Sequence, residues 1–322
     1  MSLATIYRPI QEDLAEVESR LEEATKVSPP WLAQLLKHSL KSGGKRIRPA
    51  LVLLSGRFYH YEPGYLIPMA VAIEVLHTAT LVHDDAIDHS PLRRGRPTVN
   101  KIWGDAKAIL LGDYLLAKAE ELVSETQNLR VTRLFAQAIM TLASGELGQA
   151  FSAFNLEQTQ EQYLARVSAK TASLITLAVQ SGAILSRAPE EAATTLGEYG
   201  HNLGIAFQIV DDILDFTGDE AEMGKPVGSD LAEGTLTLPA MMVLERYPVD
   251  NPIRRLFQRE GDRAENIRLA IELVAKSGVL EDCYRVAREY SARACDSLEL
   301  LAANPARESL KGLAQYVVAR KQ

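Results

Sequence analysis

The sequence has little cysteine and a small share of aromatic residues, and these scarcities exclude several classes of protein. Cys283 and Cys295, its two cysteines, have neither the spacing of a metal site nor the number that a disulfide framework needs. We therefore expect a reducing compartment, the cytoplasm. Positive charge is also in deficit, because the net charge is −7. A nucleic-acid partner is not expected, since binding a phosphate backbone requires a basic surface.

Strand patterns are almost absent as well. Apolar and polar residues rarely alternate, and no repeat, low-complexity tract or linker divides the chain. Helical spacing is common instead: Ile10, Leu14 and Val17 lie four and three residues apart, on one face of a helix. We predict a single all-α domain over residues 1–322, with about ten or more helices whose central members enclose a site.

A membrane span and a leader segment are not expected either. The first residues lack a basic start followed by an apolar core. The longest apolar stretch, residues 65–82, is long enough to cross a bilayer, but Glu74 and His77 lie in its middle. Because a charge at that depth is costly, we predict a buried helix with a polar stripe.

Two groups of aspartates carry the clearest chemical signal. HDDAID contains Asp84 and Asp88, and VDDILD contains Asp211 and Asp215, so each group reads DDxxD. The two residues of each pair are four positions apart and share a helix face. Carboxylates this close repel one another, and burial strengthens the repulsion. A divalent cation would relieve it, and oxygen ligands without cysteine favour Mg²⁺.

Mg²⁺ rarely sits in a cage made only of protein groups, and prefers a few carboxylates together with water and substrate phosphates. Two facing clusters would therefore hold several Mg²⁺ ions bridged by a diphosphate. One DDxxD alone could equally be a solvated helix face or a helix cap, but two of them within apolar helices favour the metal site. A di-iron bundle would need glutamates with ExxH pairs, which neither cluster supplies.

Three basic loops marked by glycine or proline accompany the aspartates. They are GGKRIRP at 43–49, RRGRP at 93–97 and GKP at 224–226. Each alone could be a solvated surface loop, but three in an acidic chain favour phosphate binding. Arginine forks match phosphate oxygens, and glycine-opened loops expose backbone amides. By themselves, the residues predict Mg²⁺-dependent diphosphate chemistry inside a helical bundle, with an apolar partner molecule.

The motifs together resemble those of the trans-type isoprenyl diphosphate synthases, in particular long-chain members of the octaprenyl and solanesyl type. The similarity rests on HDDAID with RRGRPT, on GGKRIRP, on KTA at 170–172 and on FQIVDDILD followed by GKPVGSDL, and it covers residues 9–320. It implies an isoprenoid-synthase-type helical bundle with a central cavity between core helices, usually a homodimer. It also implies head-to-tail condensation, in which an allylic diphosphate ionises and the alkene of isopentenyl diphosphate attacks the cation. Proton loss then leaves a product five carbons longer and pyrophosphate, with transient membrane contact for product release.

The resemblance implies roles for individual residues. The metal ligands would be Asp84, Asp88, Asp211 and Asp215, which would hold about three Mg²⁺ ions, replaceable by Mn²⁺, with Asp85 and Asp212 in support. Isopentenyl diphosphate would be bound by Lys45, Arg48, His77 and Arg94. The allylic diphosphate and its cation would be bound by Arg93, Lys170, Thr171, Gln208 and Lys225. Thr235 stands where the family often has a lysine, which puts one allylic-diphosphate contact in question but not the activity.

Product length in this family follows the side chains just before the first DDxxD. Short-chain members place an aromatic residue four or five positions before the first aspartate, where this chain has Thr80 and Ala79, with Leu76 one turn further. Since a growing chain needs volume that a ring would fill, small residues here predict a long product, about C30 to C50 with C40 favoured. Phe135 or Met140 would then form the floor. Ala79 could instead merely permit close helix packing.

Three alternatives stay open. The chain could be a short-chain synthase that makes farnesyl or geranylgeranyl diphosphate, tuned from elsewhere in the cavity. It could be a non-catalytic regulatory subunit, although such subunits usually lose one or both aspartate clusters. It could be a terpene cyclase, although a cyclase normally lacks the GGKRIRP and RRGRPT segments.

Overall fold

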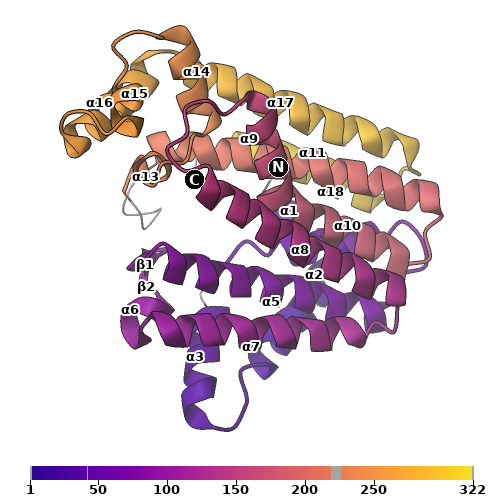
Figure 1. Ribbon diagram of the computed structural model, residues 1–322. Coiled ribbons are helices and arrows are strands. Elements are labelled where there is room, and N and C mark those ends of the chain that lie inside the picture. Colours follow the sequence, from indigo (N-terminus) through magenta and orange to yellow (C-terminus); the bar gives the residue numbers. More distant parts are fainter. Residues whose placement is uncertain (1, 42, 219–225, 321–322) are drawn as a thin grey trace.

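Helices make up nearly all of the chain, as predicted. The computed structural model describes residues 2–41, 43–218 and 226–320 (Figure 1). Its helices are α1 (Leu3–Ile6), α2 (Gln11–Glu23), α3 (Pro30–Leu40), α4 (Ile47–Gly56), α5 (Pro63–Ile87), α6 (Val99–Trp103), α7 (Asp105–Ser124), α8 (Leu129–Phe151), α9 (Gln160–Val167), α10 (Ser173–Leu185), α11 (Glu190–Thr217), α13 (Ser229–Ala232), α14 (Leu238–Arg246), α15 (Pro252–Phe257), α16 (Arg263–Lys276), α17 (Val279–Ser297) and α18 (Pro305–Ala319). In the described residues, β1 (Leu92–Arg93) and β2 (Arg96–Pro97) form one small antiparallel hairpin directly after α5. The all-α prediction is therefore confirmed.

Two long helices organise the bundle. α5 packs along α7, and α11 packs along α17 and α10. In Figure 1 the C-terminal ends of α5 and α11 point toward the same end of the molecule, where the β1–β2 hairpin and α13 lie. Since each of these helix ends carries one DDxxD, the fold brings the two aspartate clusters to the same end of the bundle.

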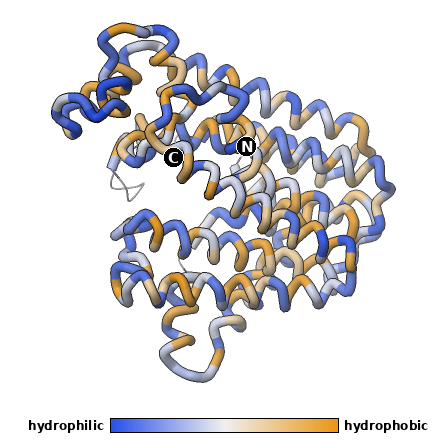
Figure 2. Tube along the Cα trace, in the orientation of Figure 1, coloured by the Kyte–Doolittle hydropathy of each residue, from blue (hydrophilic) through white to orange (hydrophobic). Residues whose placement is uncertain are grey.

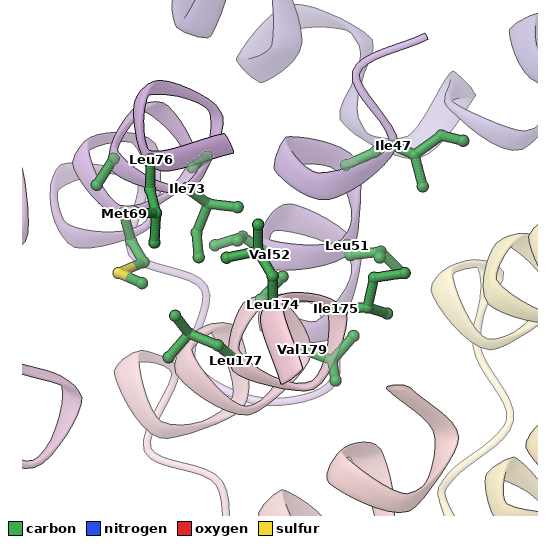
Figure 3. Packing of buried hydrophobic residues seen from close by; sticks show 14 of the residues in the cluster. Ile47, Leu51, Val52, Met69, Ile73, Leu76, Leu174, Ile175, Leu177 and Val179 are labelled. Atoms are coloured by element: carbon green, nitrogen blue, oxygen red, sulfur yellow. The ribbon is translucent and has the colours of Figure 1, made fainter. Parts of the chain in front are cut away.

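The centre of the bundle is apolar, and its inner helices have hydrophobic side chains on nearly every face. Figure 3 shows residues of α4, α5 and α10 packed against one another, with Val52, Ile73 and Leu174 among them. The peripheral helix α16 mixes hydrophilic and hydrophobic residues in Figure 2, as expected for an amphipathic helix that covers a core. Burial of the inner side chains supplies most of the free energy that holds these helices together.

Helix α5 contains the apolar stretch that is long enough to span a membrane. By length and composition it passes such a test, but 67% of its most apolar window is buried inside the protein. Its neighbours α4, α7 and α10 supply that cover. This agrees with the predicted buried helix that carries a polar stripe.

Two glycines allow the close approach of helices, Gly204 beside the turn that carries Thr171 and Gly182 near the C-terminal ends of α10 and α4. A Cβ on Gly204 of α11 would lie 2.4 Å from the Cα of Ala172, and a Cβ on Gly182 of α10 would lie 2.1 Å from the Oγ of Ser55. Neither distance is compatible with a side chain. Gly204 thereby lets α11 lie against the π-helical turn Ser168–Ala172, which joins α9 to α10.

Candidate active site

A cavity of about 740 Å³ lies at the end of the bundle where α5 and α11 carry their aspartates. Most of the residues predicted for the site line it: Lys45, Arg48, His77, Thr80, Asp84, Arg93, Arg94, Lys170, Thr171, Gln208 and Asp211. Apolar residues close its inner part: Ile47, Leu81, Leu142, Leu174 and Phe207. Charged groups of both signs therefore meet an apolar wall in one space.

Some predicted residues lie elsewhere. Asp88 is the exposed residue that follows α5, and Asp215 is 1% exposed and accepts a hydrogen bond from the Ser229 hydroxyl at 2.8 Å. Leu76 and Ala79 are buried in helix packing and do not line the cavity. Lys225 lies outside the described residues.

The first aspartate cluster contains one neutralised carboxylate and one whose charge is disfavoured. Asp85 accepts a hydrogen bond from the Arg93 Nε at 2.8 Å, so an arginine expected to bind phosphate is paired with the middle aspartate. Burial raises the pKa of Asp84 to about 6, because the attraction of Lys170 only partly offsets the loss of solvent. Burial also raises the pKa of Asp88. The charges of Asp84 and Asp88 are therefore only partly compensated by nearby cations.

The second cluster is held by protein groups. The Asp211 carboxylate forms an ion pair with Arg320 at 2.7 Å. Asp212 accepts hydrogen bonds from the Gln208 side-chain amide at 2.8 Å and from the Tyr163 hydroxyl at 2.6 Å. Burial raises the pKa of Asp212 to about 7.

The donor set fits Mg²⁺ or a similar hard cation. Within residues 2–41, 43–218 and 226–320, no three His, Cys, Asp or Glu side chains come together closely enough to hold an ion by themselves. The groups that face the cavity from the two clusters, Asp84 and Asp211, are both carboxylates. A cation that completes its shell with water and phosphate oxygens needs no more than this from the protein.

The opposite side of the cavity is cationic and is built by the loop before α4 and by the hairpin after α5. Arg94 donates a hydrogen bond to the Gly43 carbonyl, so the hairpin and the loop hold each other. The Nε of Arg48 is buried and has no hydrogen-bond partner in the described residues, and burial lowers the pKa of this guanidinium. Burial, together with Arg48 and Arg94, lowers the pKa of His77 well below its usual value. A buried arginine with an unpaired nitrogen beside a neutral imidazole is suited to an anion.

Lys170 stands between the two sides of the cavity. It lies in the π-helical turn Ser168–Ala172, a helix irregularity that is frequent at functional sites. Its ammonium forms an ion pair with Glu146 of α8 at 2.9 Å. Burial alone would lower the pKa of Lys170, but Asp84 and Glu146 raise it, so this cation stays charged.

Four cavity residues were not assigned roles from the sequence. Glu74 and Arg46 form an ion pair at 2.7 Å beside the cationic loop, and Arg46 also binds Glu18. Arg46 lies in the GGKRIRP segment, and Glu74 lies in the apolar stretch that contains His77. Their places in these two segments were the signal by which the sequence could have identified them. Glu146 had a weaker signal, as one charge among small and apolar residues of α8. Arg320 lies more than a hundred residues from Asp211, and no spacing rule connects them.

Of the three residues proposed to control product length, Thr80 lines the cavity. Leu76 lies one turn before Thr80 on α5. Ala79 is fully buried in helix packing, and its effect on product length stays a prediction.

The remaining residues expected to affect product length or diphosphate binding do not line the cavity. Phe135 is fully buried, whereas Met140 is 62% exposed and so does not form an internal floor within this chain. Thr235, at the place of the usual lysine, lies in the turn after α13, where its backbone N–H binds the Asp230 carbonyl at 2.8 Å. It does not line the cavity.

Comparison with known proteins gives a consistent result. The family model described as "Polyprenyl synthetase" matches residues 29–274. "Heptaprenyl diphosphate synthase component 2" of Bacillus subtilis is 38% identical over 321 residues, covering 100% of this chain and 92% of that protein. "Short chain isoprenyl diphosphate synthase" of Methanothermobacter thermautotrophicus is 36% identical over 326 residues, covering 100% and 99%.

Solved structures with the same fold cover the whole chain. The polyprenyl synthase of Caulobacter crescentus, complexed with calcium and isoprenyl diphosphate, superposes with a TM-score of 0.95 at 34% identity and covers 100% of this chain and 98% of that one. The decaprenyl diphosphate synthase of Rhodobacter capsulatus has a TM-score of 0.92 at 36% identity and covers 100% of both chains.

Proposed function

The chain belongs to the polyprenyl synthetase family of prenyltransferases, and we propose that it performs Mg²⁺-dependent head-to-tail condensation of isopentenyl diphosphate with an allylic diphosphate. The product we propose is a long all-trans polyprenyl diphosphate of about C30 to C50, with C40 favoured. The observation that carries the proposal is the arrangement of the cavity. Carboxylates on α5 and α11 face a cationic loop that contains a buried, unpaired arginine nitrogen, above an apolar wall.

The cationic loop is the proposed site for isopentenyl diphosphate. Arg48 and Arg94 would bind its phosphate oxygens, with Lys45 at the mouth of the loop and His77 as a neutral hydrogen-bonding partner. Glu74 holds Arg46 beside them and so fixes the loop before any ligand arrives. Preformed charge of this kind lowers the cost of ordering the site when the anion binds.

The carboxylate side is the proposed site for the allylic diphosphate. Asp84 and Asp211 would hold Mg²⁺ from two sides, with Asp88 and Asp215 in wider support, and Mg²⁺ when bound would stabilise the negative charge that develops on the leaving diphosphate. Lys170 would exchange Glu146 for a phosphate oxygen. Lys170 and Arg93 would then stabilise the same developing charge.

The apolar wall has its own proposed task. The allylic cation must be kept from water, and Leu81, Leu142 and Leu174 exclude it from the inner cavity. Thr171 and Gln208 supply the only polar oxygens we assign to the cation. A growing chain would extend from this wall past Thr80 toward Leu76, where Figure 3 shows apolar side chains of α5 facing α4 and α10.

We also propose a homodimer that works in the cytoplasm. Consecutive helices α7 and α8 each expose apolar side chains, including Leu110 on α7 and Leu147 and Phe151 on α8. An apolar face of this kind is typical of a protein interface. A heteromer is the second candidate, because one relative is named as component 2 of a heptaprenyl diphosphate synthase. Molar mass in solution, measured by light scattering of the purified chain, separates a dimer from a monomer that awaits a different partner.

Pyrophosphate release tests the proposed activity. The purified chain should release pyrophosphate only when isopentenyl diphosphate, an allylic diphosphate and Mg²⁺ are all present. Asp84→Ala and Asp211→Ala should each lower turnover by about 10²-fold or more, because they remove charge that stabilises the leaving group. Asp113→Ala, on the exposed side of α7, should leave turnover unchanged. Near-normal turnover in Asp84→Ala would refute the assignment.

A further inference from the structure

A chain of hydrogen bonds leads from the cavity into the buried interior of the protein. The Thr171 hydroxyl donates to the Gln208 Oε1 at 2.5 Å, and the Gln208 Nε2 donates to the Asp212 Oδ1 at 2.8 Å. The Tyr163 hydroxyl donates to the other oxygen of Asp212 at 2.6 Å. Thr171 and Gln208 line the cavity, whereas Asp212 and Tyr163 are 2% and 1% exposed and lie behind them.

This chain fixes which end of the Gln208 side chain faces which neighbour. A glutamine amide can turn over, which exchanges its carbonyl oxygen with its NH₂ group. Here the NH₂ group faces one Asp212 oxygen while the other Asp212 oxygen accepts from Tyr163, so the opposite orientation would place the Gln208 and Asp212 oxygens against each other. The carbonyl oxygen must then point toward Thr171 and the cavity.

These hydrogen bonds also give a role to Asp212, whose carboxylate does not line the cavity. One of its oxygens is bound by Gln208 and the other by Tyr163. α9, which carries Tyr163, packs against α11, which carries Asp212 and Gln208 (Figure 1). The hydrogen bond between Tyr163 and Asp212 therefore couples the position of α9 to the orientation of the Gln208 side-chain amide.

We propose that Tyr163 and Asp212 are positioning residues that hold the Gln208 carbonyl oxygen toward the carbon that becomes positive during catalysis. The inference deepens the proposed function and rests on it. A carbonyl dipole aimed at developing positive charge stabilises the transition state more than the ground state, which is the requirement for a rate effect. An amide that turned over would present N–H donors there and would repel the same charge.

A purely structural role is the competing explanation, since a buried tyrosine hydroxyl usually needs a partner. Tyr199 provides the matched control. It is also fully buried, on α11 nine residues before Gln208, and its hydroxyl donates to the Leu310 carbonyl of α18 at 2.9 Å. Tyr199→Phe makes the same chemical change as Tyr163→Phe without touching the chain of hydrogen bonds.

The experiment compares these two variants by steady-state kinetics and by the binding of two unreactive analogues. In Tyr163→Phe, kcat should fall roughly tenfold while KM for both substrates stays within about twofold, because the loss concerns the transition state. An allylic ammonium diphosphate, which carries a positive charge where the cation forms, should bind about tenfold more weakly. A thiolodiphosphate of the same length, whose prenyl part carries no positive charge, should bind as it does to the unchanged protein. Tyr199→Phe should change none of these values.

A second pair of variants isolates the hydrogen-bond acceptor. Asp212→Asn and Asp212→Leu both remove the negative charge, but only asparagine keeps an oxygen that can accept from Gln208. The asparagine variant should therefore retain the higher kcat. Should the leucine variant fail to fold, Tyr163→Phe decides alone.

Two results would overturn the inference. One is an unchanged kcat in Tyr163→Phe, and the other is an equal loss of affinity for the ammonium analogue and the thiolodiphosphate. Both presuppose that the unchanged protein turns over. A chain without any pyrophosphate release would instead contradict the proposed function, so the two failures are distinguishable.

Discussion

Asp84→Asn should make the metal-free protein more stable while it removes the activity. Asp84 is largely buried at the end of α5, and burial raises the pKa of its carboxyl group to about 6. Above that pH the folded protein must hold a poorly solvated negative charge. Asparagine has nearly the same shape without the charge, so the substitution removes this cost.

The size of the effect follows from the pKa. A rise from the ordinary 3.8 to about 6 corresponds to about 3 kcal/mol, at 1.36 kcal/mol for each pH unit. Solvent screening of a partly exposed side chain reduces this, and we expect about 1–2 kcal/mol. For a protein of this size the melting temperature should rise by roughly 1.5–3 °C at pH 7.5.

The pH dependence of the melting temperature tests the direction of this effect. Because the folded pKa of Asp84 is raised, its contribution to stability is present below pH 3.8 and is lost as the pH rises through about 6. The melting temperatures of wild type and Asp84→Asn should therefore differ little at pH 4.5, where only part of the cost applies, and most at pH 7.5. Calorimetry in the presence of a chelator measures both.

The opposite sign is expected at a matched surface site. Asp282 is bound by Arg246 at 2.7 Å and by Arg285 at 3.0 Å, and these hydrogen bonds lower its pKa. Asp282→Asn should therefore not raise the melting temperature. A lower melting temperature for Asp84→Asn at pH 7.5 without metal would refute the reasoning, since it would mean that protein cations already balance this charge.

Two further predictions concern the same cavity. Thr80→Phe should shorten the product measured by chromatography, because Thr80 lines the cavity, whereas Ala79→Phe should mainly lower stability, because Ala79 is fully buried and a ring would overpack its site; a shorter product from Ala79→Phe alone would reverse this assignment. Arg320→Gln should strengthen Mn²⁺ binding to the substrate-free protein severalfold, because Arg320 forms an ion pair with the Asp211 carboxylate at 2.7 Å. Electron paramagnetic resonance measures the binding, and unchanged or weaker binding would show that the ion pair does not compete with the metal.

The sequence predicted those parts of the site that depend on local spacing. Residues three, four or seven apart on a helix share a face whatever the fold, so Asp84 could be placed on the same face as His77 from the sequence alone. The glycine-marked loop before α4 and the arginines after α5 were recognised because their residue types restrict the backbone and suit phosphate. The all-α fold followed from helical periodicity in nearly every segment.

The sequence could not predict contacts made by tertiary packing. Arg320 reaches Asp211 because α18 ends beside α11, and Glu146 reaches Lys170 across two helices. Neither pair has a local pattern. The face on which Ala79 lies is also decided by which neighbour α5 packs against, and spacing alone does not specify that neighbour.

The most direct test is chromatography of the reaction product after incubation with isopentenyl diphosphate, Mg²⁺ and a mixture of allylic primers. The account predicts an all-trans polyprenyl diphosphate of about C30 to C50, since Thr80 leaves the apolar wall open for growth. A sole C15 product, or no elongation of any primer, would contradict it.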